Sequence, residues 1–491
     1  MKHDKLAESL NQIRDDYIQE AAAPQKRQPR WLGTLAAGLA LILICGAFFQ
    51  PMHNKTDGFD AEQPEALDIE QADNASTSYN LIPYAVATPA YPKLSAYPTD
   101  NNSNAYAAWL EDQRALHNQP LGYADSLTGY FSCAVPALLS DSNGSNTVCS
   151  PVNIYMALAM LAETTAGNSR DQILSLLGAE SIEALRTQAD QVWRAHYNDD
   201  GITTSILANS LWLDDAYNYN EKTVQLLADS YYASVFHGDL GSTAMSQSLR
   251  SWLDQQTNGL LKEQIQNVEI PPLSSLALAS TVCYQVQWQS HFNADLNTQA
   301  VFHSPSGERE VTYLNQELPF SSYYWGEDFG AVSLALEDNS QMWLLLPEEG
   351  TSPEELLENG NAMDFLLTKD WKNRKSMSVH LSLPKFDISS DTEISDTLQQ
   401  LGITDIFHSQ TADFSPIIPE EDGGAISQVK HAARVGIDEE GVTAAAFTVI
   451  FRAGAANLPE EEIEMVFDRP FLFCIESRDG LPLFIGIVNE A

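Results

Sequence analysis

Positive charge and cysteine are both scarce in this sequence of 491 residues. Only 26 Lys and Arg stand against 67 Asp and Glu, which gives a formal net charge of −41 at pH 7. Because so acidic a surface repels phosphate backbones, we exclude nucleic-acid binding. The cysteines are too few and too scattered for a disulfide scaffold, and none forms a C-x-x-C pair: Cys45, Cys133, Cys149, Cys283 and Cys474.

The sequence also lacks the short motifs of the common enzyme classes, such as G-x-S-x-G, H-E-x-x-H, the Walker loop and the dinucleotide fingerprint. Its 10 histidines are dispersed, and the nearest to a pair, His291 and His303, has no third ligand. The acidic run at Glu420 to Asp422 lacks the ligand spacing of a calcium loop and is typical of solvated surface. We therefore predict no enzyme activity, no metal and no cofactor.

Long hydrophobic runs are equally rare, with one exception at Trp31–Phe49. At about 1.5 Å per residue, a helix over this run is about 28 Å long, close to the thickness of a bilayer core. Lys26, Arg27 and Arg30 precede it and acidic residues follow, so the positive-inside rule places residues 1–30 in the cytoplasm and the rest outside. We predict an uncleaved, single-pass transmembrane anchor. A cleaved signal peptide with secretion, a lipoprotein signal at Cys45 and a buried soluble helix are the alternatives.

Residues 50–104 are acidic and then rich in Pro, Ser and Asn, which predicts a linker between the anchor and a folded domain at 105–491. Helix signals come early in that domain: Ser150-Pro151 is a favourable start, and Ser169-x-x-Gln172 is a capping box. Strand signals come late, including a hairpin from Phe471–Ile475 and Leu483–Val488. This order favours an α+β fold with large antiparallel sheets.

One late segment, from Asp438 to Phe451, mixes signals that normally exclude one another. It opens with acids and Gly441, continues as small residues, and ends β-branched and aromatic. Small residues disfavour a permanent central strand, and β-branched residues disfavour a helix. From composition alone, the simplest interpretation is a surface hairpin with one weak strand.

Several motifs follow one another between Leu127 and Val488. They are Ser150–Ile154 with Ala157–Leu161, Ala208–Leu213, Trp252 with Thr257–Gly259, Trp288 with Phe292, Leu383–Phe386, Leu401–Phe407, Val429–His431, Glu439–Gly441 with Ala444–Ala446, and Phe467–Phe473. With these motifs in this order, the stretch resembles the serpin family of serine protease inhibitors, of a bacterial, membrane-anchored type.

The resemblance implies three β-sheets, about eight to nine helices and an exposed reactive-centre loop at about residues 439–464. It also implies that a serine protease attacks the loop and forms an acyl-enzyme, and that the cut loop then enters the main sheet as a new strand before the ester hydrolyses. The implied hinge of that loop comprises Glu439, Gly441, Val442, Ala444, Ala445 and Ala446. Val442 and Phe447 depart from the family's inhibitory pattern, which has threonine and a small residue there.

Two counts along the loop give different scissile bonds. Counting forward from Gly441, taken as the fifteenth residue before the bond, gives Ala455-Ala456. Counting back from Asp468 gives a site near Leu458-Pro459. We favour the first, because the inserted length governs trapping. Alanine there suits the shallow specificity pocket of an elastase-like or subtilisin-like protease.

Other family positions are expected to be structural. His431 and Asn153 match the hydrogen-bonding pair of the shutter, the region below the point where the main sheet opens. Ser280 stands where that network usually has asparagine, and Gln285-Val286 replaces Lys-Gly. Trp288 matches the tryptophan that covers the breach, where the loop first enters the sheet.

The function we predict is therefore inhibition of a serine endopeptidase by a monomer that acts as a suicide substrate. The main alternative is a non-inhibitory serpin that acts as a binding or structural surface protein and is cleaved as an ordinary substrate. A third reading is a membrane-tethered sensor whose cleavage signals inward through residues 1–30.

Overall fold

The computed structural model describes residues 36–47, 84–98, 103–120, 122–140, 144–201, 203–369, 372–419, 424–439, 441 and 461–491. Ten α-helices lie in these ranges, against the eight or nine expected. They are α2 (Ser103–Leu116), α3 (Thr128–Leu139), α4 (Pro151–Thr164), α5 (Gly167–Leu177), α6 (Ile182–His196), α7 (Glu221–Ser230), α8 (Thr243–Gln256), α9 (Pro353–Glu358), α10 (Asn361–Thr368) and α11 (Ser395–Gln400).

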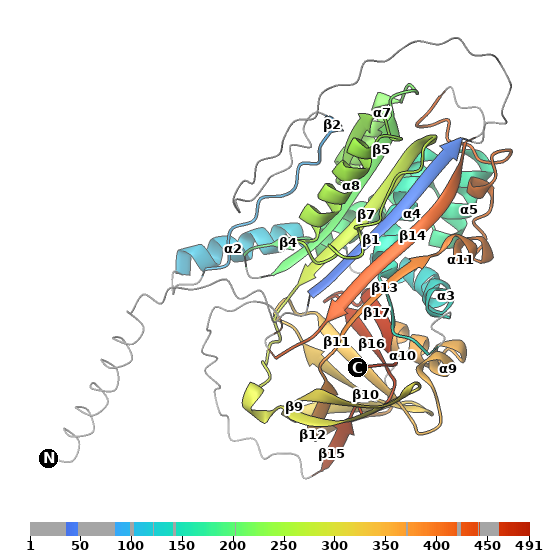
Figure 1. Ribbon diagram of the computed structural model, residues 1–491. Coiled ribbons are helices and arrows are strands. Elements are labelled where there is room, and N and C mark those ends of the chain that lie inside the picture. The colour runs from blue at the N-terminus through green and yellow to red at the C-terminus, as the bar shows by residue number, and fades with distance from the viewer. Residues whose placement is uncertain are drawn as a thin grey trace, which may run out of the picture. The chain divides into compact units, whose positions relative to one another are not determined.

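The main sheet has eight strands, of which seven follow one another in the order β13-β14-β1-β7-β5-β6-β2, while β4 pairs with β5. Their bounds are β1 (Ala36–Ala47), β2 (Ala85–Ala87), β4 (Asn198–Asp199), β5 (Thr204–Asp214), β6 (Ala233–Gly238), β7 (Ser274–Gln285), β13 (Asp387–Glu393) and β14 (Gly424–Gly436). The long strands β14, β1 and β7 lie side by side across the middle of the domain (Figure 1).

The other strands form a nine-stranded network in the order β15-β12-β9-β10-β11-β16-β17-β3, with β8 paired to β9. Only two residue pairs join β9 to β10, so the network divides there into two sheets, and the fold has the three sheets expected. The bounds are β3 (Thr147–Cys149), β8 (Thr298–Ser304), β9 (Gly307–Trp325), β10 (Phe329–Ala335), β11 (Gln341–Pro347), β12 (Arg374–Pro384), β15 (Glu462–Val466), β16 (Phe471–Glu476) and β17 (Pro482–Val488).

The main sheet is covered on both faces, which explains why β7 is almost wholly buried. Successive side chains of a strand point to opposite faces. Leu276 and Leu278 of β7 therefore join the large core that contains α4, whereas Ala277 and Ala279 pack in a smaller core with α8.

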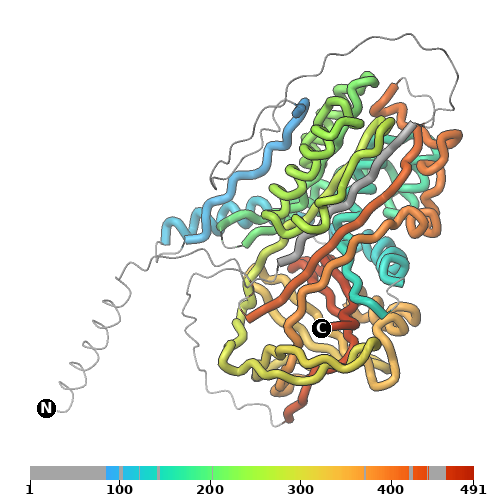
Figure 2. The backbone as a smooth tube through the Cα atoms, viewed as in Figure 1, coloured from blue at the N-terminus to red at the C-terminus, as the bar shows by residue number. Residues whose placement is uncertain are grey.

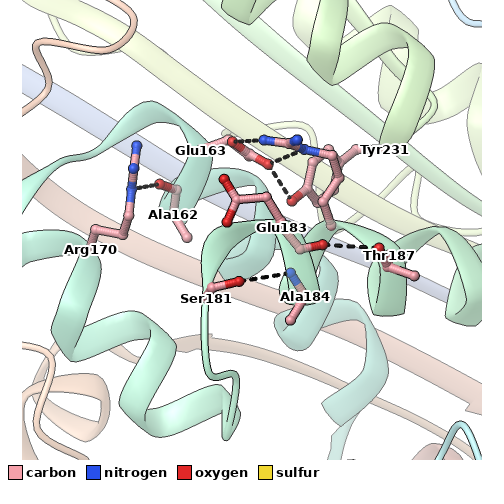
Figure 3. Close-up of polar contacts among 9 residues, drawn as sticks. Ala162, Glu163, Arg170, Ser181, Glu183, Ala184, Thr187 and Tyr231 are labelled. Carbon is pink, nitrogen blue, oxygen red and sulfur yellow. Dashed lines mark hydrogen bonds and ion pairs between the residues drawn. The ribbon is translucent and has the colours of Figure 1, made fainter.

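Helix α4 shows how the local sequence begins an element. Ser150 is its N-cap, accepting a hydrogen bond from the backbone N–H of Asn153, and Pro151 occupies the first turn, as predicted. At the end of α4, Arg186 of α6 forms a bidentate ion pair with the buried Glu163, to which the Tyr231 hydroxyl also donates (Figure 3). This cluster joins α4, α6 and the residue after α7.

Two local predictions had different outcomes. The hairpin is confirmed, since β16 and β17 pair antiparallel. The capping box at Ser169 is wrong, because α5 begins at Gly167 and the Ser169 hydroxyl donates to the backbone oxygen of Thr411 instead.

The N-terminal region differs most from expectation. We predicted a transmembrane helix over residues 31–49, but Ala36–Ala47 is the strand β1, paired antiparallel with both β14 and β7. None of the helices in the described ranges is long and apolar enough to cross a membrane.

The expected linker also overlaps with the folded domain. Strand β2 extends the main sheet beside β6, and the Tyr91 ring packs 5.3 Å from that of Trp193. Figure 2 shows this early part of the chain running along the edge of the domain beside the green segments. Residues 84–98, which fell within the expected linker, thus belong to the folded domain.

Candidate functional site

The shutter is a buried network of neutral side chains from three elements. Ser280 of β7 lies with its hydroxyl against the side-chain oxygens of Asn153 on α4 and Asn209 on β5, the second at 2.7 Å. Asn153 Nδ2 donates in turn to the backbone oxygen of Ser280 at 3.2 Å. The serine that replaces the usual asparagine therefore still joins the helix to the sheet.

His431 of β14 belongs to the same region but not to the same hydrogen bonds. Its Nε2 accepts from the backbone N–H of Ser150 at 3.3 Å, so the proton lies on Nδ1, which has no hydrogen-bond partner among the described residues. We expected His431 and Asn153 to form a direct pair. The contact instead runs through Ser150, whose hydroxyl accepts a hydrogen bond from the backbone N–H of Asn153. Burial lowers the pKa of His431 to about 3, so the ring is neutral at physiological pH.

At the level of the shutter, a strand separates the two halves of this region. Leu41 of β1 is paired with Ser280 on one side and with His431 on the other. Strands β7 and β14 are therefore not neighbours here. The main sheet has the arrangement that a loop inserted between them would produce.

The shutter lies midway along these strands, and the breach lies just beyond the C-terminal end of β7. Trp288 is almost fully buried, packs edge-on against Phe292 at 5.9 Å, and donates from Nε1 to the backbone oxygen of Asp438 at 2.8 Å. Since Asp438 follows β14 closely, this bond ties the chain leaving β14 to the chain leaving β7.

Two independent features of the breach require glycine at position 441. Its φ of +67° lies in the left-handed region, which side chains disfavour. A Cβ at this position would lie only 2.4 Å from the backbone nitrogen of Trp288 and 2.6 Å from the Cα of Gln287. The first part of the implied hinge is therefore seated against the end of β7.

Glu439 anchors the same part of the chain through its side chain and its backbone. Its carboxylate accepts from Asn297 Nδ2 at 2.6 Å and from Lys385 Nζ at 2.8 Å, and its backbone oxygen accepts from the Phe292 amide at 2.9 Å. Burial alone would raise the pKa of the Glu439 carboxyl, but its hydrogen bonds with Lys385 and Asn297 and the charge of Lys385 outweigh burial and hold that pKa below its ordinary value.

The structure thus gathers Glu439, Gly441 and Trp288 at the breach and Asn153, Ser280 and His431 at the shutter. The remaining predicted residues lie outside the described ranges: Val442, Ala444, Ala445, Ala446, Ala455, Ala456, Leu458 and Pro459.

Sequence reasoning missed three contributors, Asn209, Asn297 and Lys385. Asn209 lies inside the family motif Ala208–Leu213 and Lys385 inside the motif Leu383–Phe386, so both could have been found there. Asn297 and Lys385 are brought to Glu439 by the fold. Among the described residues, no group of three or more His, Cys, Asp or Glu side chains is placed to hold a metal ion.

The comparisons agree with this geometry. The family model "Serpin (serine protease inhibitor)" matches residues 129–491. Serpin-Z1C of Triticum aestivum is 30% identical over 71% of this chain and 91% of its own length. Serpin-ZX of Arabidopsis thaliana is 28% identical over 71% of this chain and 93% of its own. An uncharacterised serpin-like protein of Methanosarcina acetivorans is 30% identical over 70% of this chain and 81% of its own length. These relatives are plant and archaeal and give no support to a bacterial-type origin.

Solved structures show the same fold. Arabidopsis AtSerpin1 in its native stressed conformation has a TM-score of 0.65 at 24% identity and covers 76% of this chain and 99% of its own. The thermophilic serpin tengpin in its native state has a TM-score of 0.64 at 23% identity, and the match covers 81% of this chain and 98% of tengpin. With the family model spanning most of the chain, and with the breach and the shutter in place, this chain belongs to the serpin family.

Proposed function

We propose that this serpin inhibits a serine protease as a suicide substrate, and that it is not itself an enzyme. The observation that carries the proposal is the seating of Gly441. The chain leaves β14, is tied to Trp288 through Asp438, and approaches the end of β7 so closely that only glycine fits. A loop that starts at this point begins beside the adjacent ends of β7 and β14, and the proposed mechanism inserts the new strand between these two strands.

The sequence after Gly441 supports entry into the sheet. With a period of two, one face carries Val442, Ala444, Ala446, Thr448 and Ile450, none of them charged. A buried, unpaired charge would cost several kcal/mol, so this face permits insertion. About ten new backbone hydrogen bonds, each contributing about 0.5–1.5 kcal/mol net, would make the cleaved form more stable than the intact one.

The target we propose is an elastase-like or subtilisin-like protease that cleaves Ala455-Ala456, with Leu458-Pro459 as the alternative bond. Incubation with pancreatic-type elastase, in buffer or with phosphatidylcholine vesicles present, should give an adduct that survives a denaturing gel, and mass spectrometry of the released peptide should locate the bond. Cleavage into two fragments without an adduct under both conditions would defeat the proposal.

A matched pair of variants separates insertion from cleavage. Ala446→Arg places a charge on the inserting face and should turn the inhibitor into a substrate, lowering the yield of adduct at least tenfold. Ala445→Arg places the same charge on the opposite face and should lower the yield much less. Equal losses in both variants would argue against the assigned face.

The second candidate is a non-inhibitory serpin, a binding or structural protein of the cell surface. Phe447 favours it, because a large ring stands where inhibitors of the family carry a small residue. Phe447→Ala distinguishes the two functions. If the wild-type chain is cleaved without an adduct and the variant traps the protease, Phe447 has blocked insertion.

We also propose that residues 31–49 can anchor the chain in a cell membrane of a bacterium, with the serpin domain outside and acting as a monomer. The run contains no charged residue, follows three basic residues and precedes acidic ones. In cells, the protein should sediment with membranes after an alkaline wash, and added protease should remove the domain from intact cells. Recovery in the soluble fraction would defeat the anchor.

A further inference from the structure

The strand position that the proposed mechanism reserves for the cut loop is occupied by a segment from the other end of the chain. Strand β1 pairs with β14 from Ala36, opposite Gly436, to Ala47, opposite Gly424. On its other side it pairs with β7 from Ala36, opposite Gln285, to Gly46, opposite Ser274. Strands β14, β1 and β7 appear side by side in Figure 1.

The occupation is complete. Strands β1 and β7 each have 12 residues, and β1 pairs with β7 almost from end to end. A central strand uses its backbone hydrogen bonds on both sides, so β14 and β7 have no free edge left along this length. A loop entering from Gly441 would find its hydrogen-bond partners already taken.

The direction of β1 is also that of an entering loop. Ala36 pairs with Gly436 and Gln285, the ends of β14 and β7 that lie nearest to Gly441. From there β1 runs antiparallel to both neighbours, as would a loop that turns back from β14. The two segments are also alike in composition. The twelve residues of β1 include no charged residue, and residues 442–453 include one, Arg452.

The same twelve residues have a second way to satisfy their backbone. They lie inside the apolar run 31–49, which is long enough to cross a bilayer as a helix. In lipid, a helix bonds every peptide group within itself, whereas in this structure β14 and β7 supply the partners. The two arrangements exclude each other.

We propose that Ala36–Ala47 is an internal blocking strand, which keeps the main sheet closed to the reactive loop until membrane insertion withdraws it. This proposal rests on the proposed inhibitory function. Outside a membrane the protein is held in a blocked state, and the inhibitor becomes competent where residues 31–49 are taken up by lipid. Inhibitory activity would thereby be confined to the membrane surface.

Engineered disulfides in the full chain test the position of the strand. The pairs Ala40–Ala432 and Leu39–Ala433 are adjacent in the register, so one of them is the non-hydrogen-bonded type, whose side chains lie closer together. Both double-cysteine variants are made in a background that carries Cys45→Ser and Cys133→Ser. Cysteines at Ala40 and Val435 are the out-of-register control, because Val435 pairs with Ala37.

In detergent-free buffer, one in-register pair should cross-link within the monomer, and the control should not. No cross-link in either pair, equal cross-linking of the control, or cross-linking only between two copies would overturn the assignment of β1 to its own sheet. Adding phosphatidylcholine vesicles before oxidation should lower the cross-link yield at least fivefold. An unchanged yield would overturn release by the membrane.

The locked variant then tests the block. In vesicles, the chain cross-linked beforehand should form at least tenfold less adduct with elastase than the matched double-serine variant. Equal yields would overturn the competition between strand and loop. In buffer, Leu41→Pro should raise the adduct yield above that of the wild type, because proline removes a hydrogen bond from a central strand. If neither Leu41→Pro nor the chain in vesicles forms adduct, the inhibitory function fails, while the cross-link still decides the strand.

Discussion

The breach and the shutter hold the same sheet by different kinds of contact. At the breach, a glycine without a side chain lies against backbone, and the ion pair between Glu439 and Lys385 is partly open to solvent. At the shutter, Asn153, Ser280 and His431 are buried, neutral and bound to one another or to backbone. The chain that leaves β14 can therefore separate from the breach at a modest cost in free energy, whereas any movement of the strands at the shutter must break buried hydrogen bonds.

The largest effect should come from the shutter. Asn153→Ala leaves the backbone oxygen of Ser280 without its side-chain donor and creates a small cavity, so the free energy of unfolding should fall by about 3 kcal/mol. Asn168→Ala is the control, because Asn168 is exposed and bonds only to Asp405 in the described contacts, and it should cost less than about 0.5 kcal/mol. Similar losses in urea unfolding would erase the contrast.

At the breach, Gly441→Ala should be the most damaging change. The positive φ costs about 1 kcal/mol, and the contact with Trp288 should bring the total to about 2 kcal/mol. Gly350→Ala separates the two causes, because Gly350 has a φ of +93° but open space around its Cβ position. If both variants lose the same stability, the close approach of Gly441 has no energetic consequence.

The shutter should also respond to pH. The pKa of His431 is about 3 in the folded protein and about 6.5 in an unfolded chain, so only the unfolded state takes a proton between these values. Stability should therefore fall as the pH drops below about 6.5, with a slope from this residue of up to about 1.4 kcal/mol per pH unit. His431→Gln should remove that part of the slope, and the exposed His303→Gln should leave it unchanged.

The smallest effect should come from the ion pair at the breach. Lys385 is about two-fifths exposed, so Glu439→Gln should cost less than about 1 kcal/mol, and the loss should shrink at high salt. A double-mutant cycle with Lys385→Ala measures the coupling. A coupling above about 2 kcal/mol would show that the breach is held as firmly as the shutter.

Local sequence predicted elements best where neighbouring residues sufficed to specify the geometry. Ser150-Pro151 begins α4 because a hydroxyl cap and a proline need no distant partner. Ser169 failed as a cap because its hydroxyl found partners in Thr411 and Asp413, which are more than two hundred residues away along the chain.

The functional site divides in the same way. Motifs in the sequence located Gly441, Trp288, Asn153 and His431, but not the contacts between them. The link through Ser150, and the anchoring of Glu439 by Asn297 and Lys385, depend on which strands the fold brings together.

The sequence by itself determined the family and the apolar character of residues 31–49. Only the tertiary structure decided that Ala36–Ala47 is a strand between β14 and β7. An uncharged apolar segment can satisfy its backbone hydrogen bonds within a helix or with neighbouring strands, and its sequence does not choose between them. The structure around the segment decides between helix and strand. Here that structure consists of β7 and β14, which begin more than two hundred residues further along the chain.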